Sequence, residues 1–495
     1  MISLKKGGAQ AIRYALRHAH CQKNKQKEQF NVDVISGQPL YKWLELTLGD
    51  SPTNMLGSSP YTGSFIYASL FNQSVCQSVN QSVNQSVNQG VCQNVNQNIS
   101  QNVCEGFYIV KRTIVCPAQQ NYKEHRVHIT ILDPKKTKSC PAYLNKRKAL
   151  YRDILDTVKI GLLAISYLFK IKAHTNYENI KNVGTDLWIT IILLPHKRFL
   201  PPQKGEPLGP DHVNAGVSFQ ESSIKVSDIA LHPHLPNYVF DDDRTYPFYT
   251  LKPREPVINM HKPTIHNPAV LQRRILVYRE EHVLKVLLHE MIHAYDVDYS
   301  EHDDPIVIQK ENALKQKYGY NISSSKPFEL NETFTELLAC YWHVFLHRHL
   351  LCRRFFKGSL PTIPELLAQE QEVYHKTALT LLNHFGCDLS CNLICHNNAK
   401  KTKYGQYFSL NTKCAYPLRE TSHMLAYYIM KAQLWPHLEK IPVTVHSKND
   451  FYAFLDYILF MSNSNSSYSY NFSKSINKPS KKEKVKPIFT MTSLR

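Results

Sequence analysis

The sequence lacks long apolar runs, dense cysteine and the motifs that bind nucleotides or present a serine nucleophile. It contains no run of about 18 consecutive apolar residues, which argues against a membrane-spanning helix. Its 12 cysteines are spread over 495 residues, far below the density of a small disulfide-stabilised scaffold. No P-loop, G-x-G-x-x-G or G-x-S-x-G pattern occurs, so nucleotide-binding and serine-hydrolase functions lack support.

A secretory signal is also lacking. The first 21 residues, MISLKKGGAQAIRYALRHAHC, contain no apolar segment of the kind that directs secretion. We therefore expect an intracellular protein, not a secreted one, whose thiols are free in a reducing compartment.

Positive charge and histidine are in excess. Lysine and arginine number 59 against 40 acidic residues, and there are 24 histidines. Part of the positive charge lies in residues 462–495, a Ser-, Asn- and Lys-rich segment with six lysines and one glutamate. This composition predicts a basic disordered tail. Such a tail can attract nucleic acid, but we favour a solvated tail without a nucleic-acid partner.

A second biased segment, residues 73–104, repeats a Gln-Ser-Val-Asn pattern with a period of four. This period fits neither a strand face nor a helix face, so we interpret the segment as a polar insertion outside the catalytic core. The expected organisation is an N-terminal segment, the insertion, a mixed α/β lobe, a helical lobe and the tail, over residues 1–72, 73–104, 105–279, 280–461 and 462–495.

Strands are predicted mostly before residue 280 and helices mostly after it. Alternating or continuous apolar runs predict strands over residues 126–132, 187–194, 213–219 and 274–278. Helical periodicity predicts helices over residues 143–171, 280–295, 331–350, 363–385 and 420–434. This order is typical of an α+β fold in which a mixed-sheet lobe precedes a helical lobe.

The predicted helix over residues 280–295 carries a metal-binding pattern. Residues 289–293 read HEMIH, an H-E-x-x-H motif that places His289 and His293 on one helix face, one turn apart. Such a pair with one carboxylate is typical of a Zn²⁺ site that keeps an open position for water, on which Glu290 can act as general base. The rest of the helix is apolar, so these side chains need partners, because unpaired burial costs several kcal/mol.

Several residues after the motif are candidates for the third metal ligand. Tyr299 stands where a metzincin needs a histidine, which excludes that class. Asp296 and Asp298 lack the Gly-Thr-x-Asp context of an aspzincin. His302, nine residues after His293, lies in a short segment that resembles the loop of the Spartan-type DNA–protein crosslink proteases, which supplies their third histidine.

Glu332 is the favoured third ligand. It lies 39 residues after His293, on a new helix with apolar periodicity. Glu332 and Glu336 are four residues apart and share one helix face. One carboxylate can therefore bind the metal while the other accepts the free N–H of a ligating histidine. His302 stays open as the alternative.

The pairing of HEMIH with NETFTE at residues 331–336 resembles the gluzincin metallopeptidases, typified by thermolysin. The segment RETSHMLAYY at residues 419–428 is similar to the late segment of that family whose histidine stabilises the oxyanion. The resemblance implies a zincin-like active-site helix and assigns roles to residues of this chain. It implies zinc ligands His289, His293 and Glu332, the base Glu290, the metal-supporting carboxylate Glu336, and oxyanion stabilisation by His423 or by Tyr427 of the 427–428 tyrosine pair.

A second resemblance covers roughly residues 185–460. The segments VNAGVSF, ILVYREEHVLKVLLHEMIHAYDVDYS, ETFTELLA and ETSHMLAYYIMK occur in this order. They are similar to an uncharacterised metallopeptidase-like family encoded by large double-stranded DNA viruses. The resemblance implies a location in the host cytoplasm or the virion, and it transfers no substrate.

We predict from these patterns a zinc-dependent metallopeptidase that hydrolyses peptide bonds in a protein or peptide substrate. Two alternatives stay open: a catalytically inactive zincin-fold structural or interaction protein of a virus, and a Spartan-like protease with His302 as third ligand.

A group of cysteines is a candidate for a second metal site. Its members are Cys387, Cys391, Cys395 and Cys414. The spacing of four between the first three is not the usual C-x-x-C pattern, so free thiols are the favoured interpretation.

Overall fold

The computed structural model describes residues 2–21, 33–35, 107–116, 125–134, 141–172, 186–194, 198, 200–201, 203–208, 210–213, 215–220, 273–298, 304–317, 330–354, 360–387, 415–416, 424–443, 448–463, 492 and 494. The predicted insertion and nearly all of the predicted tail lie outside these residues. The division of the chain into five segments therefore stays a prediction.

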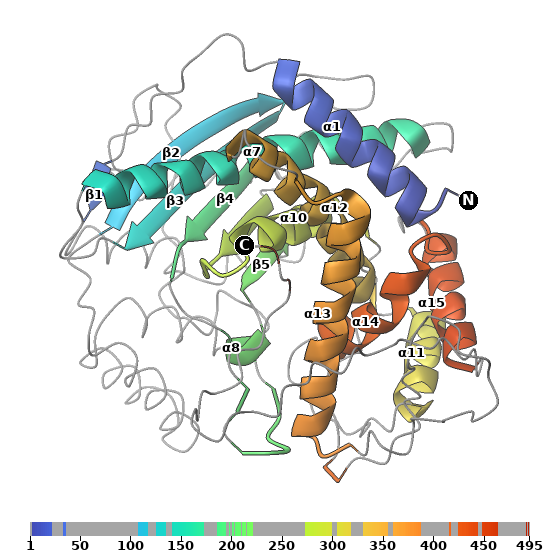
Figure 1. Ribbon diagram of the computed structural model, residues 1–495. Helices are drawn as coiled ribbons and strands as arrows, with labels where there is room; N and C mark the ends of the chain where they lie inside the picture. The colour runs from blue at the N-terminus through green and yellow to red at the C-terminus, as the bar shows by residue number, and fades with distance from the viewer. Residues whose placement is uncertain are drawn as a thin grey trace, which may run out of the picture.

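The strands form one mixed sheet of six (Figure 1). Its order is β1-β2-β3-β4-β6-β5. Strand β4 is parallel to both β3 and β6, whereas the other neighbouring pairs are antiparallel. The bounds are β1 (Asp33–Ile35), β2 (Phe107–Cys116), β3 (His125–Pro134), β4 (Leu187–Ile192), β5 (Gly216–Gln220) and β6 (Arg273–Val277).

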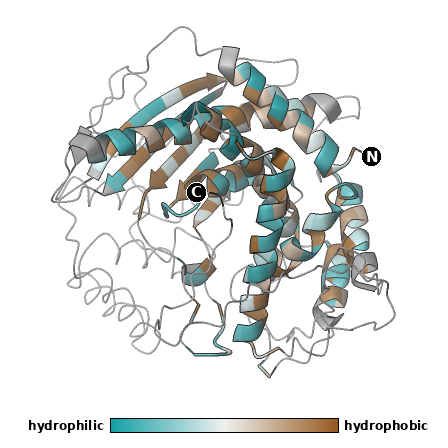
Figure 2. Cartoon of the chain, in the orientation of Figure 1, coloured by the Kyte–Doolittle hydropathy of each residue, from teal (hydrophilic) through white to brown (hydrophobic). Residues whose placement is uncertain are grey.

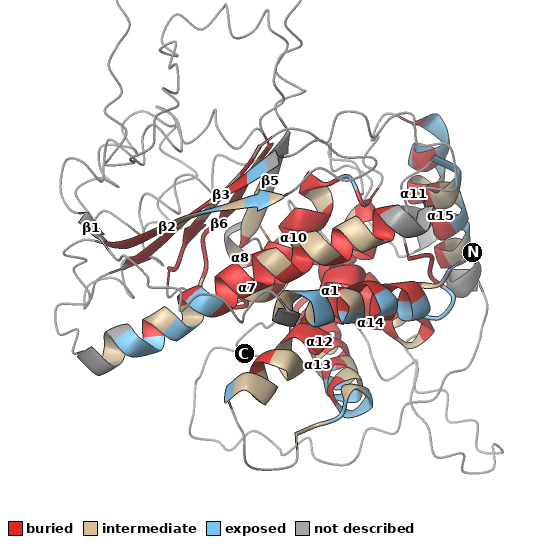
Figure 3. Cartoon of the chain, turned by 90° about the horizontal axis from the view of Figure 1, so that it is seen from above, coloured by how far each residue is buried: buried red, intermediate tan, exposed pale blue. Residues whose placement is uncertain are grey.

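The helices pack on the sheet and on one another. Helix α10 contacts β5, β6, α7 and α12, and α1 contacts α7 and α12. Figure 3 shows the buried residues concentrated along α7, α10 and α12. The bounds are α1 (Ala9–Cys21), α7 (Pro141–Lys172), α8 (Pro210–Val213), α10 (Val283–Ala294), α11 (Pro305–Lys317), α12 (Asn331–Arg354), α13 (Ile363–His384), α14 (Lys431–Leu434) and α15 (Lys448–Asn463), with the short η1 (Leu4–Gly8), η5 (Leu425–Met430) and η6 (Trp435–His437).

Burial follows the sequence pattern in both kinds of element. In β4, Leu187, Ile189 and Ile191 are buried, and the residues between them are half-buried, as alternation across a pleated strand requires. Helix α7 approaches α10 closely at Gly161, where a Cβ atom would lie 2.9 Å from the Cε atom of Met291. Figure 2 shows hydrophilic and hydrophobic residues interleaved along α1 and α13, as expected of helices that contact the core on one side.

The α+β architecture agrees with the sequence analysis, with differences at element ends. The strand predicted over 213–219 begins at Gly216, because Val213 ends the short helix α8. The described part of the helix predicted over 420–434 is π-helical from Leu425 to Met430 and becomes an α-helix only at Lys431. Strands β1 and β2 and helices α1, α8, α11 and α15 are not among the elements predicted above.

In the part of the chain that the structure describes, no helix combines the length and apolarity needed to span a bilayer. The predicted intracellular location stays a prediction.

Candidate metal centre

The chain bends sharply at the end of α10. The N–H of Val297 donates to the carbonyl of Ile292 at 3.0 Å, and Asp296 between them has a left-handed backbone with φ of 50°. This bond across five residues with a left-handed residue inside it is a Schellman-type helix end. The turn brings Asp298 back toward the last turn of the helix, where its carboxylate meets His293.

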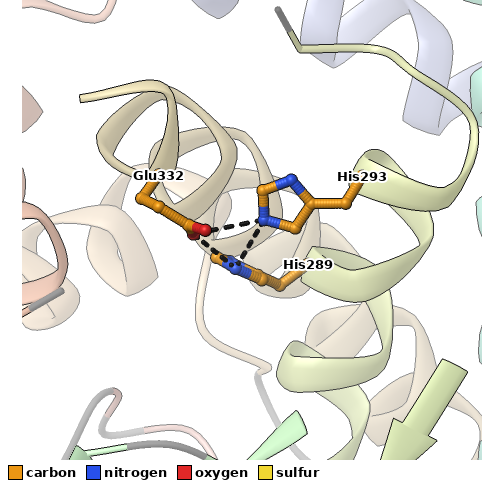
Figure 4. A group of neighbouring side chains, drawn as sticks. All are labelled: His289, His293 and Glu332. Atoms are coloured by element: carbon orange, nitrogen blue, oxygen red, sulfur yellow. Dashed lines mark hydrogen bonds and ion pairs between the residues drawn. The ribbon is translucent and has the colours of Figure 1, made fainter. Parts of the chain in front are cut away.

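Three side chains from two helices converge on one point (Figure 4). The Nε2 atoms of His289 and His293 on α10 lie 3.1 Å apart. The Oε2 atom of Glu332, in the first turn of α12, lies 3.1 Å from the first and 3.2 Å from the second. This cluster could hold a metal ion, which confirms the sequence prediction that these three residues come together.

Both imidazoles are held by carboxylates on their other nitrogen. The Nδ1 atom of His289 lies 3.1 Å from Glu336 Oε2, and the Nδ1 atom of His293 lies 2.8 Å from Asp298 Oδ2. A carboxylate there accepts the Nδ1 hydrogen, so each neutral ring presents an unprotonated Nε2. Asn331 supports this arrangement by donating its Nδ2–H to Asp298 at 3.3 Å. The site therefore has the supporting carboxylates that metal-binding histidines usually have.

Glu336 is the centre of a buried charged network. It is fully buried and accepts hydrogen bonds from the ammonium groups of Lys285 and Lys431, the latter at 2.8 Å. Burial would raise the pKa of Glu336, but the two lysines and His289 hold that pKa well below its usual range. Glu336 is therefore an anion that keeps accepting hydrogen bonds throughout the neutral pH range.

The pocket favours positive charge. Burial would lower the pKa of His293, but Asp298 and Glu332 raise that pKa well above its ordinary value. The pKa of His289 is also raised, because hydrogen bonds to Glu332 and Glu336 outweigh its burial. These carboxylates therefore attract a cation, and a metal ion can take the place of the protons.

Glu290 faces the sheet beside the histidines. Burial raises its pKa to about 7. Strand β5 approaches it at Gly216, where a Cβ atom would lie 2.7 Å from Glu290 Oε1. Between strand and helix is a cavity of about 20 Å³, enough for one water molecule. Its lining consists of Arg198, Val213, Ala215, Gly216, Lys285, Val286, His289, Glu290 and Tyr427.

The donor set and its spacing fit Zn²⁺. Two imidazole nitrogens and one carboxylate oxygen are typical of a catalytic zinc site. Ligand atoms about 2.0–2.2 Å from zinc in a tetrahedral arrangement lie about 3.3–3.6 Å from one another. The separations of 3.1–3.2 Å between these atoms need only a small expansion to reach that geometry.

Tyr427 lies at the cluster, although its contact differs from the predicted role. Its hydroxyl donates to Glu332 Oε2 at 3.1 Å, and its ring packs edge-on against His289. In this arrangement the hydroxyl stabilises the candidate ligand carboxylate. The other predicted oxyanion residue, His423, lies outside the described residues, as do His302 and Tyr299.

The aspartates after α10 have different positions. Asp296 is exposed and pairs with Arg273 at 3.1 Å, pointing away from the cluster. Asp298 holds His293, a role the sequence analysis did not assign. The only signal in the sequence was an aspartate five residues after a candidate ligand. No pattern indicated the buried ammonium groups of Lys285 and Lys431.

The cysteine group is described only in part. Cys387 is disulfide-bonded, so the expectation of free thiols is wrong at this position and the thiolate is not available to a metal. Cys391, Cys395 and Cys414 lie outside the described residues.

Comparison of the chain with protein-family models, curated proteins and solved structures finds no match. The geometry of the site and the chemistry of its residues therefore carry the functional argument.

Proposed function

We propose that the chain is a zinc-dependent peptidase of gluzincin type with a zincin-like active-site helix. His289, His293 and Glu332 hold the metal, and Glu290 is the general base. The observation that carries the proposal is the convergence of two Nε2 atoms and one carboxylate oxygen within 3.1–3.2 Å of one another.

Zinc, when bound, supplies Lewis acidity that lowers the pKa of a coordinated water to about 7 and polarises the scissile carbonyl. Glu290 takes a proton from the attacking water and passes it to the leaving nitrogen. Burial raises the pKa of Glu290 to about 7 in the metal-free protein, and a carboxylate with a pKa near the working pH can both accept and release a proton. The apolar wall of α10 limits competing water around Glu290, which is 5% exposed.

Strand β5 supports a peptide or protein as the substrate. Among the described strands it pairs with β6 alone, so it ends the sheet in this part of the chain. An extended peptide can add to such an edge through main-chain hydrogen bonds. Gly216 on β5 lies against Glu290, so a peptide on this strand lies close to the base and the candidate metal ligands.

Replacing Glu290 with Gln tests the proposal. The amide keeps size and polarity but cannot accept the proton, so zinc content and folding are retained while cleavage falls by about 10²–10⁴-fold. Cleavage of a broad peptide library, and self-cleavage during expression, are the measurements. Chelated wild type and Glu372→Gln, a change at an exposed glutamate on α13, are the controls.

One result would overturn the peptidase assignment. In that result the zinc-loaded wild type leaves the peptide library intact and behaves like Glu290→Gln in every assay. A zinc-holding structural or interaction protein would then take its place.

A further inference from the structure

Arg198 is one of the residues that line the cavity beside the candidate metal centre. One nitrogen of its guanidinium group has no hydrogen-bond partner among the described residues. The side chain is fully buried, its Nε–H donates to the carbonyl of Val213 at 2.9 Å, and its Nη1 faces Glu281 Oε2 at 3.5 Å. Its Nη2 is buried and has no hydrogen-bond partner among the described residues. Leaving a buried charged donor unpaired is costly, so this nitrogen calls for an acceptor that the folded chain does not supply.

The guanidinium is held in place by the turn before α10. Glu281 Oε2 also accepts the backbone N–H of Arg198 at 3.1 Å, and Glu281 Oε1 lies 3.4 Å from His282 Nε2. His282 has a left-handed backbone with φ of 61°, a strained conformation that a non-glycine residue keeps only where its surroundings enforce it. The free Nη2 is therefore a fixed donor, as electrostatic stabilisation of a reaction requires.

The single free nitrogen of Arg198 favours one oxygen atom as the acceptor. Carboxylates and phosphates prefer paired donors from arginine, whereas Arg198 has one free nitrogen and the cavity holds about one water. Glu281 already balances much of the positive charge of Arg198. The acceptor that suits this site is a neutral oxygen that becomes negative during the reaction. A donor that is already in place stabilises such an oxygen more in the transition state than in the bound substrate.

We propose that Arg198 donates from Nη2 to the carbonyl oxygen of the peptide bond that is cleaved. This assignment rests on the peptidase function proposed above. When the water oxygen adds to the carbonyl carbon, the π-electron pair moves onto the carbonyl oxygen, and Glu290 takes the proton that the water loses. The N–H of Arg198 then faces a negative oxygen, so the hydrogen bond is stronger in the transition state than with the bound substrate.

Paired substitutions at two buried arginines test the assignment in the full-length, zinc-loaded protein. Arg147 is also buried and pairs with Asp133 and Glu280, but it does not line the cavity. Arg147→Met and Arg198→Met both leave a glutamate without its arginine, so both lower thermal stability. Only Arg198→Met lowers kcat, by about 10²–10³-fold as for other oxyanion donors, with zinc content unchanged.

A binding measurement provides a readout that does not depend on turnover. The probe is a library of phosphinic pseudotripeptides, in which a tetrahedral phosphinate replaces the scissile amide, with affinity measured by calorimetry. We expect Arg198→Met to bind at least 10²-fold more weakly than wild type, and Arg147→Met to bind like wild type. Guanidinium chloride at millimolar concentration restores part of the affinity in Arg198→Ala. If Arg198→Met does not fold, Arg198→Lys keeps the charge and still loses affinity, because an ammonium lacks the forked geometry.

The outcomes separate the two proposals. Wild type that neither cleaves peptides nor binds the phosphinates overturns the peptidase function and the role of Arg198 with it. Wild type that binds the phosphinates, with Arg198→Met binding equally well, overturns the role of Arg198 alone.

Discussion

Two carboxylates outside the candidate ligand set hold the imidazole rings of the cluster in position. Asp298 holds His293 and Glu336 holds His289, each through Nδ1. Without such a partner, a histidine ring can rotate or change tautomer, and the Nε2 atom is no longer held ready for a metal. Removing a supporting carboxylate of this kind typically costs 10–100-fold in metal affinity or activity.

We therefore predict that Asp298→Asn weakens zinc binding by about 10–100-fold without preventing folding. Competition with a chromogenic chelator measures the affinity. Asp296→Asn is the matched control, because that aspartate is exposed and pairs with Arg273 instead. Equal zinc affinity in the two variants would contradict the supporting role of Asp298.

At this scale the sequence predicts the ligands better than their surroundings. The pairing of His289 with His293 follows from helix periodicity, because residues four apart share a face, whereas the sequence left Glu332 and His302 as alternatives for the third ligand. Arg198 could not be predicted, since it follows a predicted strand by a few residues in a loop without a pattern. Its position depends on Val213 and Glu281, contacts that only the folded chain brings about.

The site joins two elements that are distant in sequence, α10 and α12. A metal ion bound to His289, His293 and Glu332 would link them, and an ion that binds only the folded state adds to stability. At a free concentration 100 times its Kd, such an ion contributes about 2.7 kcal/mol.

We expect zinc to raise the Tm of the wild-type protein and EDTA to reverse the increase. His289→Ala and His293→Ala should bind no tight zinc and show no increase, because each removes a ligand atom. Metal analysis of the purified proteins and calorimetric scans with and without zinc provide the measurements. An equal zinc content in wild type and both variants would contradict the site.

Among the elements, the positions of α10 and α12 in the sequence could be predicted. Which strand forms the edge of the sheet beside the site could not be predicted. The apolar periodicity of both helices is local information, and so is the alternation in β4. The placement of β5 beside β6, with Gly216 against Glu290, depends on pairing between segments far apart in the chain. The π-helix over Leu425–Met430 also reflects packing, because its sequence shows ordinary helical periodicity.

For the whole molecule, the raised histidine pKa values determine how stability varies with pH. A group with a raised pKa stabilises the metal-free protein below its unfolded pKa, about 6.5 for histidine. That contribution is lost as pH rises through the pKa of the folded state. His289 and His293 both belong to this class. The affinity for zinc increases as pH rises, because fewer protons compete with the metal for the histidine nitrogens.

The increase in Tm caused by zinc should therefore be larger at about pH 8.5 than at about pH 6.5. Each proton released on zinc binding adds about 1.4 kcal/mol per pH unit to the zinc-dependent stability. Calorimetric scans with and without zinc at both pH values measure the difference. In His293→Ala, zinc should not raise the Tm more at the higher pH than at the lower pH. If the zinc-dependent increase in Tm of the wild type became smaller as pH rises, the metal site would be contradicted.

The two buried lysines on Glu336 set the net charge of the whole pocket. The charged groups are four carboxylates and two ammonium groups, from Glu290, Asp298, Glu332, Glu336, Lys285 and Lys431. With Glu290 ionised, both lysines protonated and both imidazoles neutral, two negative charges remain, which one divalent cation balances. In the metal-free protein, protons on His289 and His293 restore the same balance, in keeping with the raised pKa of each. The pocket is thus suited to exchange one divalent ion for two protons, and a monovalent ion would leave it with an uncompensated buried charge.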